Sequence, residues 1–595
     1  MFHLSVLQLM GTLFAIYIGK NVLDLYRNVQ EIKKTGIPYF IAPVCPHRML
    51  YRYSSLFWGP WVENIPGFSF VRYTRHNWNW IRKWEPFEKH GEIFACVSPG
   101  ATQLFVGDPV AMWDMANKRV EFPKDIGLYK AIDVYGKNVV TTEGKEWRLH
   151  RKITAPPFSE KNNSHVFYES LRQAHEAAKY WTAPKNQKDL GAKKPVNTVS
   201  TFTDDFMRIS LQVIAKAGFS KSLQWPSADG SIKGEVAEGS HMMTFQGSLG
   251  MVLHKIIWYI ATPKWLLRNS PFKFQQDVYT AVNEWREYML EIYREKKQRL
   301  DKEGPDALLH GGDLMDSLVP REVPEGTPFA DGKKDGLTLP EILGNTYVFM
   351  LAGHETTAHT MHYTLIFLAL NPQYQRKIQA ELDALYPDPN TELNYERDYP
   401  ALADGWVHAA LNETLRLYQP VIHIPKTSYE PHLLKTRERG DIMIPPNWNI
   451  EISTMGAHRN PRYWSPHTDA YMPERWFSSK EAEDVSTWRP TDKDEKRLKK
   501  PVNGSFMPFS EGFRACLGKK FAQVEMVAVM AEFLRNYSVE LAVDERKESW
   551  EQVAERTKKD FDQCFITITL SLTNTIPLSI VRRGEERFAG KVGSL

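Results

Sequence analysis

Cysteine is scarce in this chain of 595 residues, which has four, at Cys45, Cys96, Cys516 and Cys564. They are too few and too widely spaced for a disulfide framework. Cys516 has no neighbouring cysteine, which excludes the usual zinc and iron–sulfur spacings. The sequence also lacks internal repeats, long low-complexity segments and a glycine fingerprint for a nicotinamide cofactor. The cysteines must therefore be judged one at a time, by their local surroundings.

A strong charge imbalance is missing as well, since the net charge is only +4. No basic stripe with interleaved aromatic residues is present, so we expect no nucleic-acid partner. With 42% hydrophobic and 25% charged residues, the chain is globular and long enough to bury a substantial core.

One cysteine lies in a distinctive loop. The segment from Phe509 to Gly518 fits the pattern F-x-x-G-x-R-x-C-x-G, which presents a thiolate and then opens a helix. Gly512 permits a tight turn, and Gly518 would let the next helix approach a flat macrocycle. Backbone N–H groups can hydrogen-bond the Cys516 sulfur, and Arg514 offers a fork of donors for a haem propionate. The competing interpretation is a buried, inert cysteine beside a helix start.

These residues resemble the cysteine-ligand loop of the cytochrome P450 family. The resemblance implies haem b, iron-protoporphyrin IX, with Cys516 as the axial thiolate and the iron ligand. Phe509, Gly512, Arg514 and Gly518 would then contact the cofactor. A thiolate ligand pushes electron density onto the iron and favours O–O cleavage.

A long helix is predicted upstream of this loop. Thr338 can cap it, Pro340 suits its first turn, and Glu341 lies three residues after the cap. Apolar residues then continue to Leu370, and Asn371 followed by proline is a stop signal. The pattern predicts a helix of roughly 30 residues that crosses the whole domain.

The middle of this helix reads Ala352, Gly353, His354, Glu355, Thr356. Two small residues would let a flat ligand approach the backbone, and a carboxylate beside a hydroxyl can relay protons. The segment resembles the A-G-x-[DE]-T element of the same family, which implies Thr356 as the oxygen-side hydroxyl and Glu355 as the relay acid. The alternative is an ordinary buried helix with glycine packing and back-bonded threonines; His354 is given no role.

Two further elements support the resemblance. Glu413 and Arg416 lie on one helical face, and Pro473 to Trp476 resembles the P-E-R-F element, with Trp476 where phenylalanine is usual. The resemblance implies a scaffold triad of Glu413, Arg416 and Arg475, with the aromatic residue as a packing group.

Trp147 and Arg151 fit the W-x-x-x-R helix of the family, one turn apart, so both could face a haem propionate. An amphipathic surface helix is the alternative. On the strand after the Glu413 helix, Lys426 or His423 could make a further propionate contact, and Lys426 is preferred.

The N-terminus is interpreted as a membrane anchor over residues 1–20 and a linker over 21–37, followed by the catalytic domain over 38–595. The stretch from Phe2 to Ile18 is almost uncharged and near the lower length for a span. Basic residues on its C-terminal side favour a cytosolic catalytic domain. An ordinary amphipathic helix is the alternative. A second apolar stretch, from Met251 to Leu267, is either a core helix or a surface that dips into the bilayer.

Three later segments carry weaker expectations. A charged insertion around residues 480–500 is interpreted as a solvated loop or a partner-binding segment. Lys519 and Lys520 suggest a basic face for an acidic electron donor. Two strands, Cys564–Leu570 and Ile576–Val581, are expected to form a hairpin through Thr573 that lines the substrate pocket.

The expected fold is therefore mainly α with small β-sheets, the cytochrome P450 fold, preceded by a transmembrane helix. The resemblance implies a monooxygenase of the endoplasmic reticulum membrane that inserts one atom of O2 into a lipophilic small molecule, as in fungal specialised metabolism. Electrons would come from a separate NADPH-cytochrome P450 reductase. The alternatives are an isomerase, dehydratase or peroxygenase of the same fold, or a haem sensor or carrier without enzymatic activity.

Overall fold

The structure is a computed structural model that describes residues 2–192, 195–225, 241–304, 313–327, 334–388, 390–485 and 496–593. Helices dominate it, and the strands form four small sheets. The longer helices are α1 (Phe2–Thr35), α2 (Met49–Val62), α6 (Gly144–Thr154), α7 (Glu160–Trp181), α8 (Phe202–Phe219), α9 (Phe245–Ala261), α11 (Lys273–Glu303), α14 (Leu339–Leu370), α15 (Pro372–Leu385), α17 (Trp406–Leu417), α21 (Lys519–Asn536) and α22 (Trp550–Asp562).

Short helices connect these elements. They are α3 (Trp78–Arg82), α4 (Glu85–His90), α5 (Pro109–Asn117), α10 (Lys264–Arg268), α13 (Leu314–Leu318), α16 (Tyr395–Leu402), α18 (Thr454–Ala457), α19 (Pro461–Trp464) and α20 (Lys480–Glu483). The 3-10 turns that matter below are η6 (Pro473–Trp476) and η7 (Gly512–Arg514). The expected fold class, mainly helical with small sheets, is confirmed.

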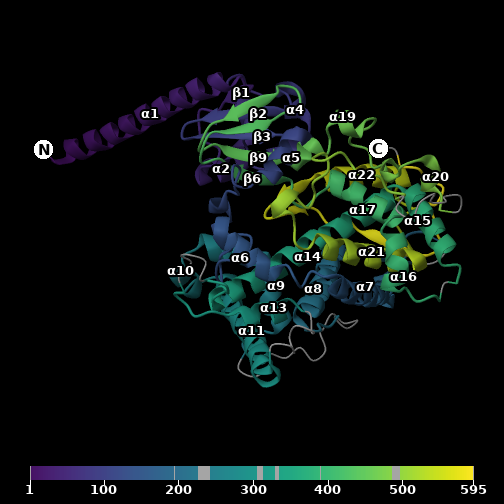
Figure 1. Cartoon of the computed structure of the whole chain (residues 1–595). Helices are drawn as coiled ribbons and strands as arrows, with labels where there is room; N and C mark the ends of the chain where they lie inside the picture. The colour runs from purple at the N-terminus through teal and green to yellow at the C-terminus, as the bar shows by residue number, and fades with distance from the viewer. Residues whose placement is uncertain are drawn as a thin grey trace.

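The largest sheet has the order β1-β2-β3-β9-β6 and lies beside the C-terminal end of α1 (Figure 1). Its strands are β1 (Tyr39–Ile41), β2 (Ile93–Ser98), β3 (Ala101–Val106), β9 (Asn449–Ser453) and β6 (His423–Thr427). β2 pairs antiparallel with β3, β3 parallel with β9, and β9 antiparallel with β6, where Lys426 lies opposite Ile450. This sheet fixes the position of Lys426.

A second sheet has the order β10-β13-β5-β4, and two hairpins make up the rest. The strands are β10 (Tyr537–Leu541), β13 (Leu578–Arg582), β5 (Val196–Val199), β4 (Gln187–Lys188), β7 (His432–Lys435), β8 (Asp441–Ile444), β11 (Cys564–Ile566) and β12 (Leu570–Leu572). The predicted C-terminal hairpin is partly wrong. β11 pairs with β12, so the turn is at residues 567–569, whereas the strand after Ile576 joins β10 and β5. The turn forms there because the Thr567 N–H donates to the Thr569 carbonyl at 3.1 Å.

Helix α14 runs through the middle of the molecule, with α8, α9 and α11 on one side of it (Figure 1). Its predicted start is confirmed, because Thr338 and Glu341 form a reciprocal capping box and Pro340 lies in the first turn. Its end is confirmed at Leu370, with Asn371 as the C-cap. From Glu341 to Leu370 the helix is buried, except for one window that contains Ala352, Gly353, Glu355 and Thr356.

Helix α1 differs from the predicted anchor and linker, because it continues from Phe2 to Thr35 without a break at residue 20. It projects from the body in Figure 1. Arg48 contacts Tyr17 and Asn21 in its middle, and its last turns pack on the body, where Ile32 is fully buried. Across the described part of the chain, no helix has both the length and the apolar character that crossing a membrane requires. The expected transmembrane helix is therefore not supported.

The apolar stretch from Met251 to Leu267 forms the end of α9 and the start of α10. Its buried side chains, among them Val252 and Ile256, make it a core element. Trp258 and Trp265 are exposed on the other side.

The charged insertion is described only up to residue 485 and from residue 496, so Asp494 and Glu495 lie outside the described residues. The expectation of a solvated loop is wrong at its end. Arg497 is buried, and its guanidinium pairs with Glu381 of α15 at 2.6 Å. Asp404 accepts the Arg497 backbone N–H at 2.9 Å, which fixes the end of the segment to the helical core.

Candidate active site

The loop around Cys516 closes on itself through backbone contacts. Gly512 has a φ of 68°, and a Cβ there would lie 2.3 Å from the Ala116 carbonyl oxygen, so only glycine fits. The Cys516 N–H donates to the Phe509 carbonyl at 2.9 Å. Gly518 differs, because a Cβ there would meet only Phe158 at 3.7 Å. The protein itself therefore does not require glycine at position 518.

The Cys516 thiol is enclosed by the fold, yet its side chain is exposed. The two descriptions agree because the surrounding protein encloses the thiol at a distance, while one side of the Cys516 side chain faces free space. Burial raises the pKa of the thiol, and the Gly518 N–H, Arg151 and Lys519 oppose that rise. A metal ion at this position would remove the proton outright.

Arg514 is held in place beside the loop. Its guanidinium pairs with Glu143 at 2.5 Å, donates to the Thr142 carbonyl at 2.7 Å and lies 4.1 Å above the centre of the Trp147 ring. Arg151, one turn after Trp147 on α6, donates to the Ala515 carbonyl at 3.0 Å. The structure thus places Trp147, Arg151 and Arg514 around one end of the cysteine loop.

Lys124 and Lys426 add two more positive charges to this region. They lie opposite each other in an antiparallel bridge. Lys426 is 4% exposed and donates to the Phe122 carbonyl at 3.1 Å. Burial, followed by repulsion from Arg514, lowers the pKa of Lys124 to about 7. Burial also lowers the pKa of Lys426 to about 8, with Arg514 again adding to the fall.

His423, the other residue considered for this contact, differs from Lys426. Burial, and after it the charge of Arg52, lowers its pKa to about 4. It is therefore neutral near pH 7 and supplies no positive charge for a propionate.

The window in α14 presents a small residue and a hydroxyl. Ala352 is exposed in the middle of the buried helix, and the Thr356 hydroxyl donates to its carbonyl at 3.0 Å. Gly353 faces the other way, because a Cβ there would lie 3.3 Å from Ile214 of α8. The expectation that both small residues open the helix to a ligand is thus wrong for Gly353, whose small size serves helix packing.

Phe158 connects this helix with the cysteine loop. Its ring lies 5.8 Å from that of Phe349, one turn before Ala352, and 6.4 Å from that of Phe521 in α21. The same ring is the nearest neighbour of Gly518. A single aromatic side chain therefore lies between the middle of α14 and the segment that carries Cys516.

Glu355, also in this window, directs its carboxylate toward the C-terminal hairpin. The Thr569 hydroxyl donates to its Oε1 at 2.7 Å. Burial raises the pKa of Glu355, and the hydrogen bond from Thr569 opposes the rise. Sequence reasoning missed Thr569, because it assigned the hairpin turn to Thr573.

The structure brings Glu413, Arg416 and Arg475 together. Glu413 pairs with Arg416 at 2.8 Å and with Arg475 at 2.9 Å, and the Glu413 and Arg416 side chains are fully buried. Burial alone would raise the pKa of Glu413, but the two guanidinium groups hold it below the usual range. Trp476 is more than a packing residue, since its indole N–H donates to Glu413 at 2.9 Å. Phenylalanine at this position would lack that hydrogen bond.

A profile of the cytochrome P450 family matches residues 60–561, which is most of the chain. The chain belongs to the cytochrome P450 family.

Named relatives agree. A cytochrome P450 monooxygenase of Arthrobotrys oligospora is 28% identical over 98% of this chain and 99% of its own length. One from Penicillium roqueforti is 29% identical over 96% of this chain and 97% of its own. One from Postia placenta is 30% identical over 78% of this chain and 81% of its own. The protein is thus a member of the P450 monooxygenase family.

Membership in the P450 family implies a haem with a thiolate ligand, and the residues present fit that group. The open side of Cys516 leaves room beside the sulfur. Lys124, Lys426 and Arg514 gather three positive charges, and among the described residues only Glu143 forms an ion pair with them. Two propionates would supply the missing negative charge. No local sequence pattern marks Lys124, which becomes part of the site only through its bridge to Lys426.

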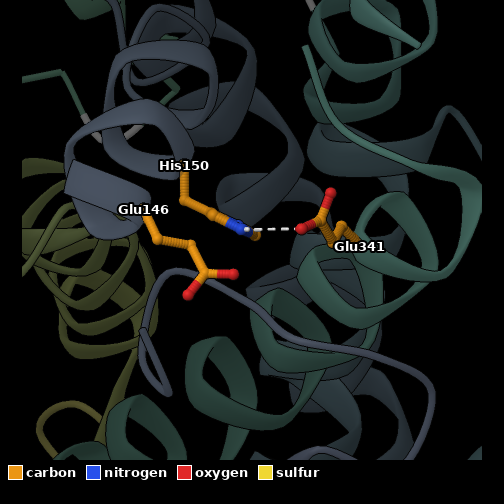
Figure 2. A group of neighbouring side chains, drawn as sticks. All are labelled: Glu146, His150 and Glu341. Atoms are coloured by element: carbon orange, nitrogen blue, oxygen red, sulfur yellow. Dashed lines mark ion pairs between the residues drawn. The ribbon is translucent and has the colours of Figure 1, made fainter. Parts of the chain in front are cut away.

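A second cluster on α6 and α14 has the composition of a metal site. Figure 2 shows Glu146 and His150 of α6 pointing toward Glu341, with His150 Nε2 3.8 Å from the Glu341 carboxylate. The hydrogen bonds around His150 argue against a bound metal ion in this cluster. Asn345 accepts the Val139 N–H through its Oδ1 and donates through Nδ2 to the Glu341 carbonyl, so the amide must also donate to His150 Nδ1. His150 therefore carries its proton on Nε2, the atom that a metal would need.

The same cluster is already neutralised by lysine. Lys334 donates to both Glu341 oxygens at 2.7 Å, and Lys137 pairs with Glu146 at 2.9 Å. Burial would raise the pKa of Glu341, but His150, Lys334 and the Thr338 N–H hold it at about 2. The cluster therefore has a structural role: it joins α6, which carries Trp147 and Arg151, to the first turn of α14.

Proposed function

We propose that this P450 is a haem-thiolate monooxygenase that inserts one atom of O2 into a lipophilic small molecule. The observation that carries the proposal is the Cys516 side chain, open on one side, together with three cations, Lys124, Lys426 and Arg514, for which only Glu143 forms an ion pair among the described residues. Cys516 would ligate the iron, while Arg514, Lys124, Lys426, Trp147 and Arg151 would hold the propionate edge. The haem, when bound, supplies the oxidising chemistry.

The protein's own contribution is position and proton delivery. Thr356, half-buried in the α14 window, would present a hydroxyl to the oxygen side, and Glu355, one residue earlier, would act as the acid that resupplies its proton. The raised pKa of Glu355 suits this role, because a carboxyl group that titrates closer to neutrality can both give and regain a proton. Glu413, Arg416, Arg475 and Trp476 would keep the scaffold behind the haem rigid.

Electrons would come from a separate NADPH-cytochrome P450 reductase. Lys519 is exposed at the start of α21, three residues after Cys516, and Lys520 follows it. An acidic partner would be attracted to this basic face.

We also propose that the enzyme associates with a membrane, as at the endoplasmic reticulum. α1 exposes apolar side chains along its length, including Leu9, Leu13, Phe14 and Ile18. The proposed contact is with the membrane surface, where an apolar helix face can lie in the headgroup region. Flotation of the full chain with phospholipid vesicles checks this: it should float, and a Leu13→Glu/Phe14→Glu variant should float less.

The deciding experiment for the function uses purified holoprotein with reductase, NADPH and a panel of lipophilic compounds. A bound substrate should shift the Soret band, and turnover should incorporate labelled oxygen from ¹⁸O2 into the product. Product formed without NADPH or reductase would instead indicate isomerase, dehydratase or peroxygenase chemistry. A Soret band that no compound in a wide panel shifts, with no product, would favour a haem sensor or carrier.

A further inference from the structure

The partner of Glu355 lies far away in the sequence, on the turn between β11 and β12. Thr569 is the one hydrogen-bonding residue that the described part of the chain gives to the Glu355 carboxylate, through Oε1 at 2.7 Å. A hydroxyl has one proton to donate, and here it is directed at the carboxylate. One carboxylate oxygen is thus fixed on the hairpin side of α14, and no hydrogen bond to the other is found among the described residues.

His359 orients the same hydroxyl. Its Nδ1 lies 3.3 Å from the Thr569 oxygen. Because the Thr569 proton is used for Glu355, the histidine must be the donor, which places its proton on Nδ1. His359 lies one turn after Glu355 on α14 and stacks on Tyr363, with ring centres 5.5 Å apart. The donors therefore run in one direction, from His359 to Thr569 to Glu355.

The turn that carries Thr569 is fixed from both sides. The Leu570 N–H donates to the Pro420 carbonyl at 2.8 Å. The Tyr363 hydroxyl, from α14 itself, donates to the Leu570 carbonyl at 2.7 Å. Thr569 is consequently a positioned residue, and its contact with Glu355 does not depend on a freely moving loop.

Beside this turn lies a cavity of about 250 Å³, formed by α8, α9, α14 and the hairpin, whose residues Thr567, Ile568 and Ser571 line it on either side of Thr569 in the sequence. Glu355 and His359 lie in its wall, and Asp204, which is exposed at the surface, lies in the wall on the α8 side. At roughly 30 Å³ per molecule of liquid water, such a volume holds several waters. Polar groups on its wall give those waters hydrogen-bond partners.

We propose that Thr569, oriented by His359, positions Glu355 between this water-filled cavity and Thr356, so that Glu355 regains from cavity water the proton it gives up. The inference rests on the proposed monooxygenase function and adds the C-terminal hairpin to it. The protons balance as follows: Glu355 releases one proton toward Thr356 and becomes a carboxylate held by Thr569. It then takes one proton from a cavity water, which is itself reprotonated from bulk solvent, so that no hydroxide remains.

The test compares Thr569→Val, which keeps the shape and loses the hydroxyl, with Thr569→Ser, which restores it. The matched control is Thr573→Val, just beyond β12 and outside the cavity wall. In the holoenzyme, Thr569→Val should lower the fraction of NADPH electrons recovered in product by at least about tenfold and increase the solvent isotope effect. Serine should rescue both values, and the control should leave both unchanged. Substrate-induced Soret shifts should persist in all three variants.

A second measurement does not depend on turnover. Infrared difference spectroscopy follows the carboxyl band of Glu355, identified by its loss in Glu355→Gln. Removing the Thr569 hydrogen bond should move its titration to higher pH, and serine should restore it. An unchanged titration and unchanged coupling in Thr569→Val would overturn the positioning role, as would an equal loss in the control. If the wild type forms no NADPH-dependent product, the proposed function fails, while the infrared titration still reports on the contact.

Discussion

Lys124 and Lys426 illustrate how much of this site is set by charge at single residues. Both ammonium groups are held inside the protein near Arg514, and their pKa values fall to about 7 and about 8. A lysine whose pKa is lower in the folded than in the unfolded state releases its proton on folding. Without a dianionic ligand, the site therefore stabilises the fold least when both lysines are charged.

This gives a prediction for the apoprotein. Its free energy of unfolding should rise as the pH increases from about 6 to 9, because the unfolded state binds more protons in this range. Denaturant titration at several pH values measures it. Lys124→Met should flatten the dependence and also speed the loss of haem from the holoprotein. A steeper rise in the variant would contradict the assignment.

At Cys516, the prediction concerns ligation. Cys516→Ser should remove the long-wavelength Soret band of the ferrous–carbonyl complex, because an alcohol does not donate to iron as a thiolate does. Absorption spectra of the reduced, carbon monoxide-treated protein check it. Cys564→Ser, at a buried cysteine outside this loop, is the control and should keep the band. Survival of the band in Cys516→Ser would mean that another residue holds the metal.

Among the elements, α17 and η6 depend on a single carboxylate. Glu413 accepts from Arg416, Arg475, Trp476 and the Met472 N–H. Removing its charge leaves two guanidinium groups, one fully and one largely buried, without an anionic partner, so Glu413→Gln should cost about 3–5 kcal/mol of folding stability. Trp476→Phe removes one hydrogen bond to a charged group and should cost about 1.5–3 kcal/mol. Denaturant unfolding measures both, and equal costs would argue against the hydrogen-bond account.

The sequence predicted those elements whose ends and faces are determined by residues close together in the chain. The capping box at Thr338 and the asparagine and proline after Leu370 defined α14, and the spacing of Glu413 and Arg416 placed both on one helical face. Contacts between distant parts of the chain, such as strand pairing and ion pairs, left no such local signal. The strand after Ile576 joins a different sheet from the one expected, and Arg497 is buried by an ion pair with a residue more than 100 positions away.

The candidate active site was predicted only in part, because some of its residues lie in local motifs and others are placed by long-range contacts. Cys516, Arg514, Trp147 and Arg151 lie in compact motifs, and the structure brings them together. Lys124 and Thr569 lie in irregular segments, and each acquires its place only from a contact with another part of the chain. A pattern that recurs every three or four residues does not signal such contacts.

The whole molecule should respond to acid through its buried carboxylates. Glu341, with its pKa held at about 2, joins the start of α14 to α6. A carboxyl whose pKa is lower in the folded state contributes stability above its unfolded pKa, near 4.3, and loses that contribution as the pH falls toward 2. Glu341→Gln should therefore make stability less dependent on pH between about 5 and 2, as circular dichroism would show. Glu325→Gln, at an exposed position, is the matched control and should behave like the wild type.

The window in α14 has a consequence for how such an enzyme diversifies. Ala352 and Thr356 belong to the central helix, yet neither is needed to fill the core around it. Exchanging side chains at these two positions should leave the melting temperature almost unaltered. A larger residue at Ala352 should change which molecules are accepted, and loss of the Thr356 hydroxyl should change the proposed proton delivery. The longest buried helix of this protein thus includes two positions at which new catalytic properties can arise with little effect on stability.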